Sequence, residues 1–174
     1  HLYHVAYSED LYSILQRGIQ PNETSPRDKL ESALSQIAEQ FDLDFPIDRR
    51  NCVYFYPRIQ RALRQVPTGS TSDTLSRSQE IVVVDGAEID QPLYIGEFRL
   101  ISDAIDFKYR DEPDDTMISE SFDDALRRYA ATLRPVDSLT ALPKLCDQYE
   151  LAEVVIESGV DAETIVGWES FTVG

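Results

Sequence analysis

The sequence predicts an α+β fold in a single domain that spans residues 1–174. Short apolar runs of strand length dominate the second half of the chain, whereas most segments with helical periodicity lie in the first half. Strands and helices that are segregated along the chain, rather than alternating, indicate the α+β class. A chain of 174 residues can also bury a sizeable core without metals or disulfides.

The N-terminal part of the chain predicts a strand and two helices. Residues 2–7 form an apolar run of strand length. The helix after them is expected to begin with Ser8 as its N-cap and to end at Gly18. A second helix is expected over residues 25–41, where apolar side chains recur at helical spacing.

The run at 52–56 is aromatic and β-branched, which predicts a half-buried central strand. Pro57 suits the first turn of a helix that would follow this strand. Apolar runs, alternation and helical spacing predict the remaining elements, which are strands at 81–84, 92–101, 151–156 and 164–168 and a helix at 122–133.

The chain carries 32 acidic and 16 basic residues, a net charge of −16, and its acidic residues are spread along most of its length. This distribution indicates an acidic surface on a folded domain rather than a disordered tail. We interpret it as a halophilic adaptation of a cytoplasmic protein, with an ordinary acidic protein as the alternative. The two cysteines lack C-x-x-C spacing, which favours buried free thiols in a reducing cytoplasm. We expect no membrane span and no signal peptide.

Residues 49–72 form a basic stretch in this acidic chain, with five arginines and no carboxylate. Such a stretch predicts either an anion-binding site or arginines that pair with acidic residues elsewhere. Sequence signatures of several other sites are absent: there is no G-x-G-x-x-G, Walker loop, H-E-x-x-H or Cys/His cluster. Dinucleotide-fold, P-loop and zinc sites therefore have little support, and no metal is expected.

Three short motifs resemble those of the ADP-ribosyltransferase superfamily. They are Tyr3-His4 followed by a helix that ends in Gly18, the aromatic strand that runs into Pro57-Arg58, and the glutamate-bearing strand at 151–156 with the segment 160–165 after it. The Pro-Arg pair is closest to the toxin-type DNA ADP-ribosyltransferases, although Ala6 stands where that group usually has threonine. Glu150 precedes Glu153 by three positions, whereas two is the spacing of arginine-modifying members.

The resemblance implies a split β-sheet core with flanking helices and NAD as the substrate. It implies transfer of ADP-ribose to a macromolecular acceptor, which could be nucleic acid or protein, and an antitoxin or other protein partner. The acidic surface argues against broad nucleic-acid affinity, but a local arginine groove could still bind a strand. Two alternatives stay open: an RNA 2′-phosphotransferase-like enzyme, and a non-catalytic module that binds a nucleotide or a protein partner.

The resemblance implies a catalytic role for Glu153. Nicotinamide leaves NAD as a neutral group, so the barrier lies in the positive charge that develops on the ribose. A carboxylate bonded to a ribose hydroxyl would stabilise that charge. The alternative is that Glu153 is one more surface acid among 32.

Four further residues are candidates for the site. The resemblance implies that His4 bonds the adenosine-side ribose, and the alternative is a satisfied core histidine. Tyr54 and Tyr56 share one side of their strand, where either could stack on nicotinamide or simply pack in the core. Arg58 is placed to meet the diphosphate or to act on the acceptor.

The halophilic interpretation predicts that native structure depends on salt. Self-repulsion of the acidic surface is screened within about 3 Å at 1 M salt but over much longer distances in dilute buffer. Circular dichroism across a salt series should therefore show structure lost as salt is removed. Full native structure at about 50 mM salt would contradict the interpretation.

Overall fold

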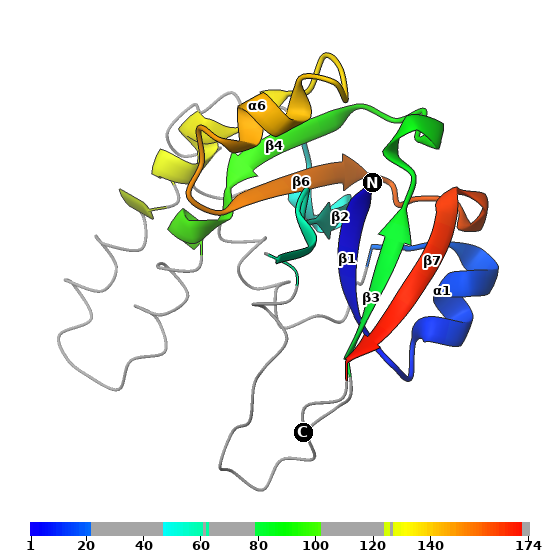
Figure 1. Cartoon of the computed structure of the whole chain (residues 1–174). Helices are drawn as coiled ribbons and strands as arrows, with labels where there is room; N and C mark the ends of the chain where they lie inside the picture. The colour runs from blue at the N-terminus through cyan, green and yellow to red at the C-terminus, as the bar shows by residue number, and fades with distance from the viewer. Residues whose placement is uncertain (22–46, 61, 63–78, 102–123, 126, 172–174) are drawn as a thin grey trace, which may run out of the picture.

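The computed structural model describes residues 1–21, 47–60, 62, 79–101, 124–125 and 127–171, and two antiparallel β-sheets form its framework (Figure 1). The first sheet has the order β1-β3-β7, with strands Leu2–Tyr7, Gln79–Val84 and Ile165–Phe171. The second has the order β2-β6-β4-β5, with strands Cys52–Phe55, Ala152–Glu157, Leu93–Glu97 and Arg134–Pro135. Sheets and short helices together confirm a mixed fold of the α+β type.

The two sheets meet where β1 passes the end of β2. Tyr3 and Tyr56 exchange backbone hydrogen bonds there, with N···O distances of 2.9 and 2.7 Å. One residue further along β1, His4 donates from Nδ1 to the carbonyl oxygen of Tyr54 at 2.9 Å. The sheets diverge on either side of this junction (Figure 1), so the framework consists of two sheets that meet at β1 and β2.

The helices of the described residues are short. They are α1 Leu11–Arg17, α6 Leu142–Cys146 and the 3₁₀ turns η1 Arg49–Asn51, η2 Gly86–Glu88 and η3 Ala162–Thr164, with further helical residues at 59–60, 62, 98–101, 124–125 and 127–132. In Figure 1, α6 lies against the second sheet and α1 beside the first. Within the described part of the chain, no helix is long and apolar enough to cross a membrane.

The main apolar core takes side chains from both sheets. Its members from β2 and β6 include Phe55, Val154 and Ile156, all completely buried. Val82 and Val84 of β3 join them from the first sheet. Both cysteines are buried thiols that form no disulfide, as the sequence predicts.

Two expectations about local structure are wrong. Ser8 does not cap α1: the N-cap is Asp10, and the Ser8 hydroxyl donates instead to Glu80 Oε1 at 2.8 Å. The strand expected over 92–101 ends at Glu97, because its partner β6 begins opposite that residue at Ala152. The expected helix at 25–41 lies outside the described residues, and α6 was not expected.

A close backbone contact at the end of α1 predicts a strong effect of one glycine substitution. Gly18 has φ +82°, and a Cβ there would lie 2.0 Å from the carbonyl oxygen of Val160, which accepts a hydrogen bond from Ile19 N. Gly18→Ala should therefore lower the free energy of unfolding by more than about 3 kcal/mol, as in severe overpacking.

The matched control is Gly167 on β7, where an added Cβ meets nothing within 4 Å. Gly167→Ala should leave stability unchanged or raise it slightly, because glycine weakens strand interiors. Urea unfolding of both variants measures the difference, and equal midpoints would contradict the described packing around Gly18.

Candidate functional site

Glu153 lies on β6, paired in register with Gly96 of β4, and only 2 % of it is exposed. Side chains alternate along a strand, so Glu153 points away from the main core, which receives its neighbour Val154. Gly96 makes room for an aromatic ring on the Glu153 side. A Cβ at Gly96 would lie 3.1 Å from Cε2 of Tyr129 and 3.0 Å from Cδ2 of Leu133.

The Glu153 carboxylate belongs to a buried hydrogen-bonded cluster with Arg49 and Tyr129. Its Oε1 accepts from Arg49 Nη1 at 2.8 Å and from the Tyr129 hydroxyl at 2.6 Å. Arg49 Nη1 also donates to the Tyr129 hydroxyl oxygen. Both bonds go to Oε1, and Oε2 has no donor among the described residues. A buried charge needs such compensation, because the protein interior solvates ions poorly.

Arg49 is as deeply buried as Glu153 and is fixed by the aromatic residues around it. Its guanidinium carbon lies 4.6 Å from the ring centre of Tyr54 and 4.7 Å from that of Tyr129, within the range of cation–π attraction. The Tyr54 hydroxyl donates to the backbone carbonyl of Arg49 at 2.6 Å. Tyr54 therefore holds Arg49, which in turn neutralises Glu153. Strand alternation alone could not predict this contact between Tyr54 and Arg49.

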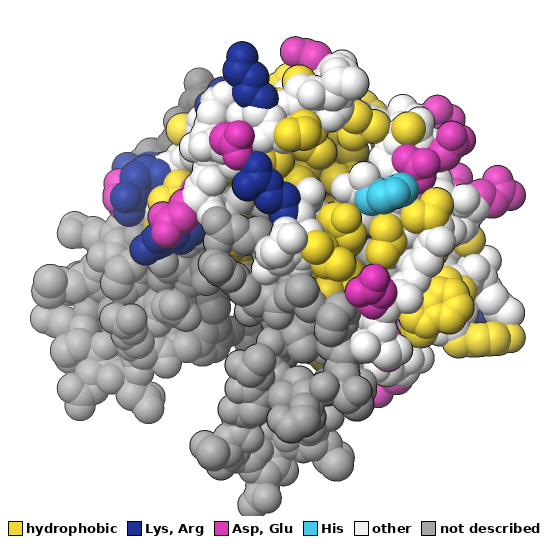
Figure 2. All heavy atoms as spheres, in the orientation of Figure 1, with side chains coloured by type: hydrophobic (Ala, Val, Ile, Leu, Met, Phe, Trp, Pro, Cys, Tyr) yellow, Lys and Arg dark blue, Asp and Glu magenta, His cyan; other side chains and the backbone are white. Residues whose placement is uncertain are grey.

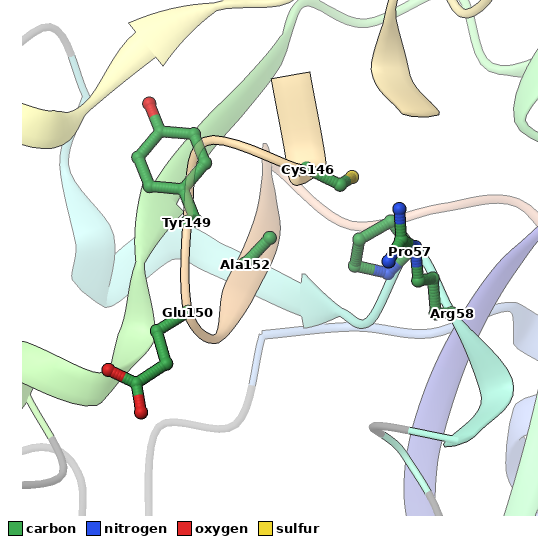
Figure 3. Close-up of a pocket in the computed structure, with 6 residues that line it drawn as sticks. All are labelled: Pro57, Arg58, Cys146, Tyr149, Glu150 and Ala152. Atoms are coloured by element: carbon green, nitrogen blue, oxygen red, sulfur yellow. The ribbon is translucent and has the colours of Figure 1, made fainter. Parts of the chain in front are cut away.

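Arg58 lies at a different place, in a small pocket beside α6 (Figure 3). The pocket is lined by Pro57, Arg58, Cys146, Tyr149, Glu150 and Ala152, and its volume of about 20 Å³ suits a single water molecule. Arg58 forms an ion pair with Asp147, whose carboxylate raises the pKa of Arg58. Burial raises the pKa of the Cys146 thiol, so the thiol is protonated near neutral pH and is a poor nucleophile.

The pocket of Arg58 and the carboxylate of Glu153 do not face each other. Ala152, which lines the pocket, belongs to the main core, and the next residue Glu153 points to the opposite face of β6. Glu150 also points away from Arg58 in Figure 3 and pairs with Arg99. Arg58 and Glu153, the two predicted catalytic residues, are therefore not brought together.

The predicted cofactor-binding residues are divided between the two faces. The His4 ring lies 5.6 Å from the ring of Phe55, which is in the main core. Tyr56 packs in another cluster and meets Phe98 edge to face at 6.3 Å. Tyr54 and Tyr56 lie in clusters other than that of Phe55, as strand alternation predicts. Tyr54 contacts Arg49, which bonds Glu153.

The described arginines of the basic stretch all have acidic partners. Arg49 pairs with Glu153, Arg50 with Asp48 and Arg58 with Asp147. In Figure 2 the basic side chains on the visible face gather in its left half, with acidic side chains among them. For these three arginines, the structure therefore agrees with the second prediction for the basic stretch, that its arginines pair with acidic residues. The described residues contain no group of three or more His, Cys, Asp or Glu side chains that could hold a metal ion.

Arg49 and Tyr129 are the two members of the cluster that sequence reasoning did not assign to a site. Arg49 was one of five arginines in the basic stretch, and Tyr129 occupied an apolar position of an expected helix. Their contacts with Glu153 span 104 and 24 positions along the chain. The one signal in the sequence was Gly96, because a glycine inside a predicted strand often marks a close approach by another group.

Comparison with protein-family models found no match for the chain, and comparisons with curated proteins and with solved structures found none either.

The difference in burial between two ion pairs predicts a difference in stability. Arg49→Met would leave the Glu153 charge buried without its cationic partner, which should lower the free energy of unfolding by about 3–5 kcal/mol. Arg58→Met removes an ion pair whose side chains are 48 % and 67 % exposed, so the unfolding midpoint should hardly move. Urea unfolding at fixed salt compares the two variants. A loss for Arg58→Met as large as that for Arg49→Met would contradict the assigned burial.

Proposed function

We propose that the chain is an NAD-dependent mono-ADP-ribosyltransferase that acts on a macromolecular acceptor, nucleic acid or protein. One observation carries the proposal: the Glu153 carboxylate is held on β6 with Oε1 bonded to two donors, while Oε2 bonds no donor in the part of the chain that the structure describes. Oε2 can accept a hydrogen bond from a ribose hydroxyl of NAD. The motifs around His4, Pro57-Arg58 and Glu153 resemble those of ADP-ribosyltransferases, and transfer of ADP-ribose is a reaction for which such a carboxylate is suited.

The proposed reaction breaks the bond between nicotinamide and ribose and forms a bond from the same ribose carbon to a nitrogen or oxygen atom of the acceptor. That acceptor atom loses its proton as the bond forms, so the products are ADP-ribosylated acceptor, nicotinamide and one proton. Nicotinamide takes the bonding electron pair and leaves neutral, while positive charge develops on the ribose. A fixed carboxylate stabilises that charge without reorganising at the moment of reaction. Glu153 meets this requirement because its Arg49 and Tyr129 bonds prevent it from swinging freely.

The position of Glu153 relative to the sheet junction also supports the proposal. The Tyr3–Tyr56 bridge joins the sheets, and the resemblance implies a split β-sheet core of this general kind. Residues 53–56 lead from the strand beside β6 to that junction. A dinucleotide bound at the junction would lie near Tyr54, Tyr56 and Glu153. NAD also has to gain access to the Glu153 carboxylate, since that residue is 2 % exposed.

A second function, that of a non-catalytic binding module, is favoured by a different aspect of the same cluster. Arg49 neutralises Glu153 in the interior, and buried ion pairs also occur for structural reasons. Such a module could bind a nucleotide or a protein partner without cleaving NAD. Release of nicotinamide from isotopically labelled NAD by the wild-type chain would exclude this function.

The test of the proposed function is the effect of Glu153→Gln on NAD turnover. The amide oxygen can still accept from Arg49 and Tyr129, so we expect the fold and NAD binding to be retained. Loss of a charge that acts in the transition state should lower kcat by about 10² or more with little change in KM. Labelled nicotinamide release measures both constants, with circular dichroism as the check on folding.

Glu150→Gln is the matched control, because it removes a carboxylate three residues away. The side chain of Glu150 is 62 % exposed and pairs with Arg99. We expect it to matter much less than Glu153. Glu153→Gln activity within about threefold of wild type would make Glu153 a bystander and overturn the proposal.

A further inference from the structure

The bonds around Glu153 form a closed triangle of donors and acceptors. Arg49 Nη1 donates both to Glu153 Oε1 and to the Tyr129 hydroxyl oxygen, and the Tyr129 hydroxyl donates in turn to Glu153 Oε1. All three side chains are buried. Two donors on one oxygen fix both the position of the carboxylate and its rotation, so that Oε1 and Oε2 are not equivalent.

The residues that form this triangle are themselves held by the fold. Asp48 accepts from Asn51 N through its backbone carbonyl at 3.0 Å, which closes the η1 turn on which Arg49 sits. The Tyr54 hydroxyl holds the Arg49 carbonyl at 2.6 Å. Gly96 leaves the space that the Tyr129 ring occupies. The arrangement is therefore set by β2, β4, β6 and the 127–132 helix together.

We propose that Arg49 and Tyr129 are positioning residues for Glu153, holding Oε1 so that Oε2 is the oxygen presented to a ribose hydroxyl of NAD. This inference rests on the proposed function and states which residues orient the Glu153 carboxylate. Neither residue has to touch NAD for this role. The effect of each passes through the Glu153 carboxylate.

Tyr129→Phe isolates this role, because it removes the hydroxyl and keeps the ring that packs beside Gly96 and Arg49. Loss of one hydrogen bond to a charged group should lower kcat for NAD cleavage by about tenfold, with KM for NAD unchanged. The same substitution in the Glu153→Gln background should lower kcat by less than about twofold, because coupled residues are not additive.

Thr164→Val is the control for a merely structural loss. Thr164 is 7 % exposed, and its hydroxyl donates to the carbonyl oxygen of Asp161 at 2.7 Å, on η3 and away from the cluster. This variant also loses one buried hydroxyl bond, and it should keep wild-type kcat at temperatures where it is folded. A fall in kcat equal to that of Tyr129→Phe would overturn the inference.

The deciding experiment is the double-mutant cycle of Tyr129→Phe and Glu153→Gln, read as labelled nicotinamide release and as KM for NAD. A kcat loss confined to the wild-type background supports the positioning role. Equal losses in the two backgrounds, or no loss in either, would overturn this inference while leaving the proposed function in place. Absence of NAD cleavage by the folded wild-type chain would overturn the proposed function and this inference with it.

Discussion

Arg49 and Glu153 hold opposite charges 2.8 Å apart in a part of the protein that water hardly reaches. Burying either charge alone would be costly, so each depends on the other and on the hydroxyl of Tyr129. This requirement extends through the fold. The buried ion pair needs a glycine at position 96 of β4, a tyrosine on the 127–132 helix and the η1 turn before β2. These parts are distant along the chain and come together only on folding.

The predicted site residues fall into two groups because strand alternation directs them to opposite faces of the second sheet. Glu153 lies with Arg49 and Tyr54 on one face of the second sheet. Arg58 pairs with Asp147 beside α6 on the other face, and His4 packs against Phe55 of the main core. In the proposed function, the Glu153 carboxylate stabilises the positive charge that develops on the ribose. The prediction that Arg58 meets the diphosphate or the acceptor requires Arg58 to leave Asp147.

The strands were readily predicted because burial imposes apolar runs and alternation that are visible locally. The ends of elements were harder: Ser8 satisfies the distant Glu80 rather than its own helix, and β4 stops at Glu97 where its partner begins. The family resemblance, together with its position in a predicted strand, selected Glu153. Its partners could not be predicted, because their contacts cross 104 and 24 positions and a buried arginine looks like any other in a basic stretch.

The most direct test of the account is a crystal structure of the Glu153→Gln variant with NAD bound, in which slow turnover should keep the dinucleotide intact. The account predicts a ribose hydroxyl of the nicotinamide riboside about 3 Å from the side chain at position 153, within hydrogen-bond range. Arg49 and Tyr129 should still bond the other side of that group. NAD bound away from position 153, with the cluster closed and untouched, would contradict the central claim that Glu153 is the group that acts on the ribose.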